Sequence, residues 1–463
     1  MVDMNHIILE NYWRFFKGNI LQKQRKIRQL SLHEIKKIQW KRLKKLLDYV
    51  YNNNDFYKDY FESVNLTPDD INEPQDMRKL LLTEKKTYKI NFNKIISKGV
   101  IEDDLILSCT SGSTGQPFKF YTDIIRESPN LYAAFVLNKE AMGIKSFEKS
   151  NELDIRIIPR NVILDLTKNC KIERGNFLKN LFNSKIIGIR TIDITLKNVD
   201  NFLKIIEDNK IETLYGYSSS ILSLSEYIAK SNNKIKIKYV ILAGEGLLNY
   251  QKSIISTNLH CPVYMDYGAS ECMRMGFECK YQNGYHMDIY NYFFEYIKDN
   301  DYAKNDEIGD LVVTNLNNYI FPFIRYRIGD AVLVSDQSCQ CKINFPIVKK
   351  IYGRMTDRIK TPTGKNMSID VFFYEFELLY NYVNQFRVIQ VKNDELLIKI
   401  VPTDIMNEEK RISIEKLINN LTEDSMKVTV ELVKEISPLK SGKKRVVISK
   451  DEYDRLIKSG ELL

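Results

Sequence analysis

Short apolar runs alternate with segments of helical periodicity between residues 154 and 266, and this alternation limits the folds open to the chain. The apolar runs are residues 154–158, 162–164, 185–189, 211–217, 238–242 and 262–266. The segments with helical spacing between them are residues 199–208 and 220–230. Strands that alternate with helices predict βαβ units and a largely parallel sheet. Ligands bind outside the carboxyl ends of the strands in such sheets, so the residues that follow each run are the first site candidates.

Aromatic residues, glycines and carboxylates follow three of these runs. Tyr217 ends one run, Gly244 and Glu245 follow the next, and residues 267–271, Tyr-Gly-Ala-Ser-Glu, follow the third. An aromatic ring beside a glycine can lie flat on a nucleotide base, and a carboxylate there could hold Mg²⁺ against phosphates. A tyrosine that caps a core and a glutamate in a salt bridge are the ordinary alternatives for each residue taken alone.

A segment dense in glycine and hydroxyl residues, 110–115, lies between the apolar runs 105–107 and 118–121. This composition predicts a tight loop that joins two strands, because glycine tolerates backbone conformations that side chains forbid. Such a loop can offer N–H and O–H donors to phosphate oxygens. No Gly-Lys-Ser/Thr follows, so it is not a Walker loop. A polar hairpin without a ligand is the simpler alternative for this stretch alone.

The composition is that of a globular protein with more than one hydrophobic core. The 463 residues are 44% hydrophobic and 28% charged, and no run of about 18 apolar residues exists. The first residues have neither a basic nor an apolar signal region, so we expect a cytoplasmic protein without membrane insertion. The net charge of +9 comes from scattered Lys and Arg with acids among them, which indicates a solvated surface and no nucleic-acid partner.

The C-terminal part predicts a second, smaller unit. Asp330 ends the stretch 322–330 and could accept two hydrogen bonds from a ribose diol. Charged residues and glycines from 353 onward are compatible with a hinge, and the strands and helices predicted after it suggest a compact α+β domain. We therefore predict an N-terminal domain of residues 1–352 and a C-terminal domain of residues 353–463.

Together these motifs resemble the adenylate-forming (AMP-forming acyl ligase) superfamily, and within it the phenylacetate–CoA ligase-like family, which includes capsular-polysaccharide-associated members. The resemblance runs from residues 39–43 to Lys443. It implies an α/β fold whose large N-terminal domain has layered βαβ sheets and binds ATP and the acyl group. It also implies a small, mobile α+β C-terminal domain that carries a catalytic lysine.

The resemblance assigns roles residue by residue. It implies catalytic roles for Lys443, Glu271 and Thr114, with Glu271 directed toward Mg²⁺. It implies that the nucleotide site is formed by Thr110, Ser111, Gly112, Ser113, Gly115, Gly244, Glu245, Tyr267, Gly268, Asp330 and, at the hinge, Arg354. It implies that the acyl group is contacted by Tyr217, Gly268 and Ala269.

The activity implied is adenylation of a carboxylic acid by ATP and Mg²⁺, followed by acyl transfer to an acceptor, CoA by default. An amide-forming ligase with an amine acceptor, in polysaccharide or natural-product synthesis, is the alternative, and a nucleotide-binding homologue without turnover is a third. Thr356 departs from the usual hinge pattern, and residues 216–219 lack the family's proline, which leaves the acceptor step and the acyl pocket open. The oligomeric state, a homodimer included, is open too.

An odd number of cysteines, seven, makes a disulfide framework improbable and leaves free thiols or a metal site. Cys279 and His286, with the later pair Cys339 and Cys341, form a Cys₃His set suited to structural Zn²⁺. Members of the resembled family carry the same pattern at these places, which favours zinc over unrelated thiols. Cys272 is interpreted as an ordinary packed residue, because no histidine is near it in sequence.

Overall fold

The computed structural model describes residues 19–460 except 101–104, 110–117, 145–153, 159–185, 191–198, 209–211, 232–235, 355–358, 365, 368–371, 373–374, 377 and 438–444. The apolar run 162–164, the glycine-rich segment 110–115, Thr356 and Lys443 lie outside the described residues. The predictions made for them are therefore neither confirmed nor contradicted by the structure.

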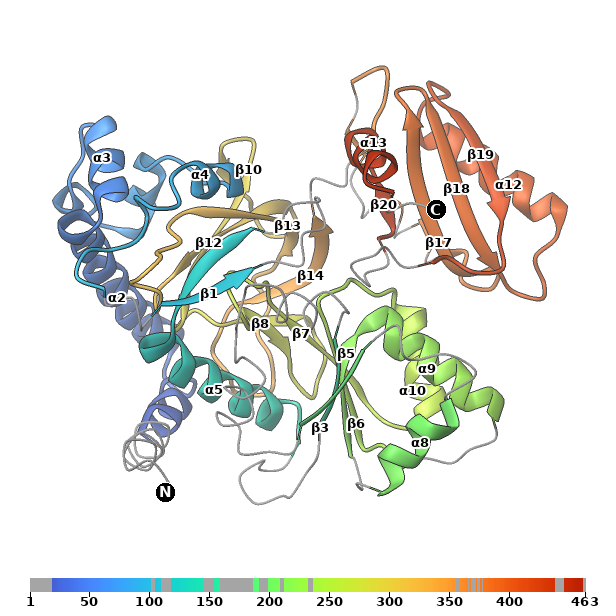
Figure 1. Ribbon diagram of the computed structural model, residues 1–463, viewed down its shortest axis with the longest axis horizontal. Coiled ribbons are helices and arrows are strands. Elements are labelled where there is room, and N and C mark those ends of the chain that lie inside the picture. Colours follow the sequence, from blue (N-terminus) through green and yellow to red (C-terminus); the bar gives the residue numbers. More distant parts are fainter. Residues whose placement is uncertain are drawn as a thin grey trace.

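Two amphipathic helices, α2 (Leu32–Asn53) and α3 (Asp55–Ser63), form one end of the N-terminal body (Figure 1). The side chain of Ser31 accepts a hydrogen bond from the backbone of Glu34, whose carboxylate accepts one in return, so α2 begins with a capping box. Its buried face packs on the core that contains Tyr319 and Ile324. The short η1 (Pro68–Asp70), η2 (Pro74–Lys79) and α4 (Lys85–Ile90) follow.

A twelve-stranded sheet forms the centre of the body, in the order β11-β10-β12-β13-β14-β9-β8-β7-β6-β5-β3-β4. Its parallel strands are β3 (Asp154–Ile158), β4 (Ile186–Arg190), β5 (Thr213–Tyr217), β6 (Tyr239–Ala243) and β7 (Val263–Tyr267). The antiparallel strands are β8 (Gly276–Glu278), β9 (Tyr285–Met287), β10 (Tyr292–Lys298), β11 (Asp301–Tyr302), β12 (Ile308–Asn315), β13 (Tyr326–Val334) and β14 (Ile347–Arg354).

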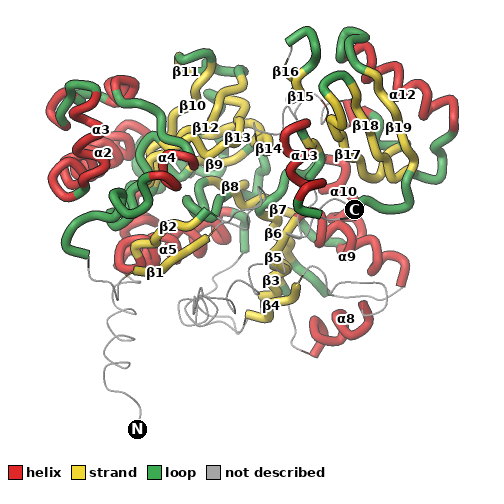
Figure 2. The backbone as a smooth tube through the Cα atoms, turned by 45° about the horizontal axis from the view of Figure 1, so that its top comes forward, coloured by secondary structure: helices red, strands yellow, loops and turns green. Residues whose placement is uncertain are grey.

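The prediction of a largely parallel sheet, made for residues 154–266, thus holds for the strands β3 to β7, and the later strands β8 to β14 pair antiparallel. Parallel pairing needs a crossover connection, usually a helix, and the segments between β8 and β14 have no such helix. The helices α8 (Val199–Asp208), α9 (Ser218–Ser231) and α10 (Asn249–Leu259) lie beside the parallel strands (Figure 2). Residues after α5 (Ile124–Ala141) pack with the buried side chains Ile241, Tyr264 and Phe277.

The strands that flank the glycine-rich segment form a two-stranded antiparallel sheet, β1 (Leu105–Cys109) and β2 (Lys119–Asp123). Cys109 is the register partner of Lys119, so the two strands predicted on either side of the glycine-rich segment pair with each other. Phe118, directly after this segment, is buried in the same cluster as Cys272. This packing holds one end of the segment near the loop that follows β7.

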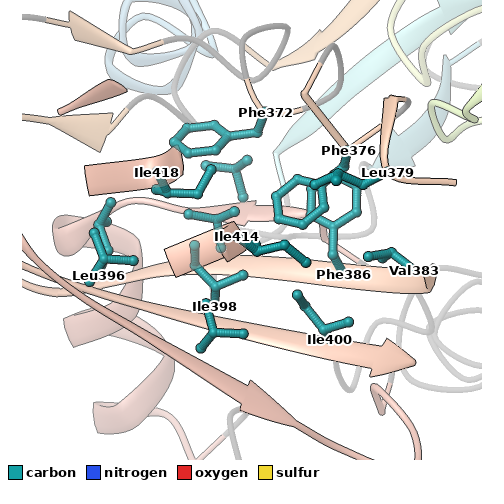
Figure 3. Packing of buried hydrophobic residues seen from close by; sticks show 14 of the residues in the cluster. Phe372, Phe376, Leu379, Val383, Phe386, Leu396, Ile398, Ile400, Ile414 and Ile418 are labelled. Atoms are coloured by element: carbon teal, nitrogen blue, oxygen red, sulfur yellow. The ribbon is translucent and has the colours of Figure 1, made fainter. Parts of the chain in front are cut away.

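The C-terminal domain contains a four-stranded sheet, β19-β18-β17-β20, and the helices α12 (Glu408–Leu421) and α13 (Lys450–Lys458). The strands are β17 (Val383–Lys392), β18 (Glu395–Pro402), β19 (Lys427–Leu432) and β20 (Val447–Ile448), with a separate pair β15 (Ile359–Lys360) and β16 (Asn366–Met367). Phe376 and Phe386 stack in its core with ring centroids 3.9 Å apart (Figure 3). The α+β character of this domain is confirmed.

The C-terminal domain contacts the body at the start of α10. The side chain of Leu248 is part of the C-terminal hydrophobic cluster. The hydroxyl of Tyr250 and the amide Nε2 of Gln251 both donate to the backbone oxygen of Asn384, at 3.0 and 3.3 Å. The exact position of the boundary, between residues 352 and 353, stays a prediction.

Candidate functional site

Tyr267 and Asp330, both predicted as nucleotide residues, meet at the carboxyl end of β7. The phenol of Tyr267 donates a hydrogen bond to Oδ2 of Asp330 at 2.6 Å. Burial and the neighbouring Asp330 carboxylate raise the pKa of Tyr267 well above its ordinary value, so the phenol keeps its proton and donates. The structure therefore brings together two residues that are 63 positions apart in the sequence.

Glu271, the predicted Mg²⁺ ligand, lies in the loop after β7 with its side chain 9% exposed. The hydroxyl of Tyr326, the first residue of β13, donates to Oε1 of Glu271 at 3.2 Å. Among the described residues, Glu271 takes part in no ion pair. An ionised carboxylate has about four acceptor positions, so Glu271 retains capacity for a cation. This donor set fits Mg²⁺, which is bound through one or two carboxylates together with phosphates.

The loop that holds Glu271 is closed by short backbone contacts. A Cβ at Gly268 would lie 2.6 Å from the backbone nitrogen of Arg274, so a side chain does not fit there. The backbone N–H of Ala269 donates to the oxygen of Cys272 at 3.1 Å. Cys272 is fully buried, and this burial raises the pKa of its thiol well above the ordinary value. The prediction that Cys272 is a packed residue is confirmed.

Arg274 anchors this loop, a role that was not predicted from the sequence. Its guanidinium forms a buried ion pair with the carboxylate of Asp266 and lies 4.2 Å from the ring centroid of Phe135. The hydroxyl of Tyr215 donates to the same carboxylate at 3.2 Å. No periodicity or spacing distinguishes Arg274 from a surface arginine, so nothing in the sequence pattern indicates this pairing.

Tyr217 and Gly244 lie against each other at the ends of β5 and β6. A Cβ at Gly244 would lie 2.5 Å from Cε1 of Tyr217, and Gly244 has φ +77°. Both observations require glycine at this position. The neighbouring Glu245 does not extend freely toward a ligand: its Oε2 accepts a hydrogen bond from the backbone N–H of Ser219 at 3.0 Å, in the first turn of α9.

Arg325, within the stretch 322–330 that ends at Asp330, has a structural role. Arg325 is buried and forms a bidentate ion pair with Glu295, with Nε–Oε2 at 3.0 Å and Nη2–Oε1 at 2.9 Å. The hydroxyl of Tyr57 supports the same loop by donating to the backbone oxygen of Pro322 at 2.7 Å. These contacts hold the chain that leads to Asp330.

Arg354, predicted at the hinge, is the last residue of β14 and the register partner of Asp330. The predicted hinge residue thus lies directly beside the Tyr267–Asp330 pair. The structure thus pairs Tyr267 with Asp330, Asp330 with the backbone of Arg354, and Tyr217 with Gly244, while the ligand-binding roles of these residues stay predictions.

The four predicted metal-ligating residues come together in one cluster. Cys279 and His286 lie on either side of the β8–β9 turn, and Cys339 and Cys341 lie in the loop between β13 and β14. All four donor atoms lie within 4.8 Å of one another. The Sγ atoms of Cys279 and Cys339 are 3.5 Å apart, and Sγ of Cys341 is 3.3 Å from Nε2 of His286.

The chemistry of this cluster fits a metal ion. Hydrogen bonds from the neighbouring thiols lower the pKa of the Cys279 thiol below its ordinary value, which favours the thiolate that a metal binds. Nε2 of His286 faces the sulfurs, while its Nδ1 is buried without a hydrogen-bond partner among the described residues. A closed set of three thiols and one imidazole has the composition of a tetrahedral structural site.

The fold and the site define a class of protein. The structure resembles 2-hydroxyisobutyryl-CoA ligase in the postadenylation state, with a TM-score of 0.71 at 17% identity over 92% of this chain and 91% of that chain. It also resembles the amide bond synthetase McbA from Marinactinospora thermotolerans, with a TM-score of 0.52 at 13% identity over 77% of this chain and 70% of that chain. The fold is that of the adenylate-forming enzymes.

Sequence relatives belong to the same class. Protein CapK from Staphylococcus aureus is 26% identical over 96% of this chain and 98% of its own length. A phenylacetate-coenzyme A ligase from Pseudomonas putida is 22% identical over 93% of this chain and 88% of its own length. Indoleacetate–lysine synthetase from Pseudomonas savastanoi is 22% identical over 83% of this chain and 88% of its own length.

The C-terminal part matches a family model of its own. Residues 359–450 match the model for the CapK C-terminal domain. Over most of its length the chain is therefore similar to ligases of the adenylate-forming class. Within the described residues, no helix has both the length and the apolar character needed to cross a membrane.

Proposed function

We propose that this protein uses ATP to adenylate a carboxylic acid, releases pyrophosphate and then transfers the acyl group to an acceptor. The observation that carries this proposal is the convergence of Tyr267, Glu271 and Asp330 at the carboxyl end of β7. Each offers the chemistry that one part of MgATP needs, and parallel sheets bind ligands at this edge.

In this proposal the ring of Tyr267 lies on adenine and Asp330 accepts a hydrogen bond from the ribose. An ionised carboxylate offers about four acceptor positions, so Asp330 can accept from a ribose hydroxyl in addition to the phenol of Tyr267. Glu271 holds Mg²⁺, which neutralises phosphate charge when bound. Residues 110–115, Thr114 included, contact the phosphates, and Gly244 leaves room for Tyr217 beside the acyl group.

The first half-reaction develops negative charge on the phosphoryl oxygens as the acid's carboxylate attacks the α-phosphorus and the bond to pyrophosphate breaks. Catalysis of phosphoryl transfer relies on positioning and on electrostatic stabilisation of that charge. We assign the stabilising cation to Lys443. In the second half-reaction the acceptor's nucleophilic atom attacks the acyl carbonyl and AMP leaves, so Lys443 is no longer required at the phosphate.

The division of labour between domains is part of the proposal. Residues 1–352 bind ATP and the acid, and residues 353–463 carry Lys443 and move between the two half-reactions. The docking contact combines the polar contacts of Tyr250 and Gln251 with Asn384 and the apolar side chain of Leu248, and we propose that the domain leaves this position between the half-reactions.

The acceptor has two candidates. CoA is the first, since relatives and structural neighbours are named as CoA ligases. An amine is the second, since the relative from Pseudomonas savastanoi is named indoleacetate–lysine synthetase and McbA is named an amide bond synthetase. Both acceptors attack the same acyl-adenylate.

The cluster Cys279, His286, Cys339 and Cys341 is proposed to hold a structural Zn²⁺. Thiolate and imidazole donors in a closed set of four suit this ion. Bound there, the ion would fasten the loop between β13 and β14 to the β8–β9 turn. It would thereby steady β13, which carries Asp330, against β8, which follows the Glu271 loop.

ATP–pyrophosphate exchange tests the proposal. We expect exchange that depends on one class of acid in a screen of aryl, fatty and amino acids, followed by product formation when CoA or free amines are added. Lys443→Ala should remove most exchange and leave MgATP binding largely intact, while the matched variant Lys444→Ala should retain exchange. Exchange without any acid, no exchange with any acid, or near wild-type exchange in Lys443→Ala would contradict the proposal.

A further inference from the structure

Arg387 in β17 is a buried cation without an acidic partner in the part of the chain that the structure describes. Its side chain is 6% exposed, and none of the described carboxylates forms an ion pair with it. Burial lowers the pKa of this guanidinium to about 10. A buried charge costs free energy unless hydrogen bonds or an opposite charge compensate it, so the hydrogen bonds of Arg387 must offset the cost of burying its guanidinium.

Those contacts are with two backbone carbonyls on either side of one segment. Nε of Arg387 donates to the backbone oxygen of Arg445 at 2.8 Å, and Nη2 donates to that of Ser437 at 2.9 Å. Residues 438–444, the segment between these positions in the sequence, include Lys443. The guanidinium of Arg387 therefore joins Ser437, which precedes the segment, to Arg445, which follows it.

The residue that follows the segment is held by further contacts. The backbone N–H of Val388, the next residue in β17, donates to the oxygen of Val446 at 2.7 Å. The guanidinium of Arg445 forms an ion pair with Glu452 of α13 at 2.7 Å, and both side chains are about nine-tenths buried. Arg387 therefore connects Ser437 to Arg445 and Val446, which are held by α13 and β17.

We propose that Arg387 is a positioning residue for the adenylation step, because its planar fork holds both ends of the segment that carries Lys443. The inference rests on the proposed role of Lys443. Fixing the two ends of a segment removes conformations in which its side chain is out of reach, and effective positioning of a catalytic group accounts for large rate factors. A lysine is a point charge without a fork and cannot hold two carbonyls in this way.

The test compares Arg387→Gln and Arg387→Lys with Arg411→Gln. Arg411 is a matched control: it lies in the same domain and donates to a backbone carbonyl, that of Val430, but its ion pairs are with Glu408 and Glu415 of α12. Using the acid that supports the fastest exchange, we expect both Arg387 variants to lower the kcat of exchange by about tenfold with little change in the KM for ATP. Arg411→Gln should match the wild type.

Limited trypsin digestion gives a second readout that needs no substrate. Cleavage after Lys440, Lys443 and Lys444 should become about tenfold faster in both Arg387 variants, relative to cleavage elsewhere in the chain, because local opening governs proteolysis. Acyl transfer from the chemically prepared acyl-adenylate should stay at the wild-type rate. A purely structural role would instead lower the melting temperature and slow both half-reactions equally, which would overturn the proposal.

The two proposals fail in different ways. If Lys443→Ala retains exchange, the proposed function of Lys443 is wrong. If Lys443→Ala loses exchange while both Arg387 variants keep wild-type exchange and the wild-type digestion pattern, the function stands and the positioning role of Arg387 is wrong.

Discussion

The phenol of Tyr267 donates a 2.6 Å hydrogen bond to Asp330 and thereby ties the end of β7 to β13 across the sheet. These strands are separated in the sheet by β8, β9 and β14, so the contact is made by side chains above the sheet edge. It places an aromatic ring and a carboxylate acceptor where the proposed nucleotide needs both.

Tyr267→Phe keeps the ring and removes the hydroxyl, so we expect a modest loss of MgATP affinity, about threefold to tenfold. Asp330→Ala removes an ionised acceptor and should weaken binding by about tenfold to a hundredfold. Isothermal titration calorimetry with MgATP measures both. Tyr281→Phe, at an exposed tyrosine, is the control and should bind like the wild type. Equal affinities in all variants would remove Tyr267 and Asp330 from the nucleotide site.

Tyr326→Phe tests how Glu271 is held. The variant removes the 3.2 Å hydrogen bond to Oε1 of Glu271 and leaves the ring packed. We expect the Mg²⁺ concentration for half-maximal exchange to rise about threefold to tenfold, since one hydrogen bond to a charged group is lost. Tyr227→Phe, in α9 beside the parallel strands, should leave this concentration unchanged. An unchanged Mg²⁺ dependence in Tyr326→Phe would contradict a positioning role.

Gly244→Ala should be strongly destabilising, because the new Cβ would lie 2.5 Å from the Tyr217 ring and the backbone has φ +77°. Gly99→Ala is matched in backbone, with φ +71°, but has nothing within 4 Å of the added Cβ. Left-handed strain alone costs about 1–2 kcal/mol, and the clash should add about 1–3 kcal/mol for Gly244→Ala. Urea unfolding measures both. An equal decrease in the free energy of unfolding in the two variants would mean that the Tyr217 side chain moves aside at no cost.

Metal analysis tests the Cys₃His cluster. Protein purified without chelator should contain about one Zn²⁺ per chain, and chelation should lower the melting temperature. Cys341→Ser should lose the metal, whereas Cys261→Ser, at a buried cysteine outside the cluster, should keep it. Substoichiometric metal in the wild type, or full metal content in Cys341→Ser, would show that the four residues do not form a zinc site.

Buried tyrosines predict a loss of stability at high pH. Burial raises the pKa of Tyr57, Tyr267, Tyr292 and Tyr326 well above the value of about 10 expected in the unfolded chain. Their contribution is fully present below about pH 10. Above it the unfolded chain ionises first, so the free energy of unfolding falls by about 1.4 kcal/mol per pH unit for each tyrosine. Urea midpoints should therefore drop steeply above about pH 10, and less steeply in Tyr57→Phe.

The parallel strands could be predicted because each is a continuous apolar run between helices with clear periodicity. The antiparallel half could not be predicted in this way. β8 and β9 have only three residues each, too few for an alternating pattern, and β9 pairs with β14, which is distant in the sequence. The anchors Arg274 and Arg387 were missed for a related reason, since their partners are set by folding alone.

The sequence by itself determined which chemical groups are present and in what order: the glycines that close turns, the aromatic and acidic residues after strands, and the Cys₃His donor set. Only the tertiary structure decided which of the carboxylates remain available to a ligand. Glu295 forms an ion pair with Arg325, and Glu245 accepts a hydrogen bond from the backbone N–H of Ser219. Among the described residues, Glu271 accepts a hydrogen bond only from Tyr326. A carboxylate has the same composition in each case, and its availability depends on which side chains the packing of distant strands brings within hydrogen-bonding distance.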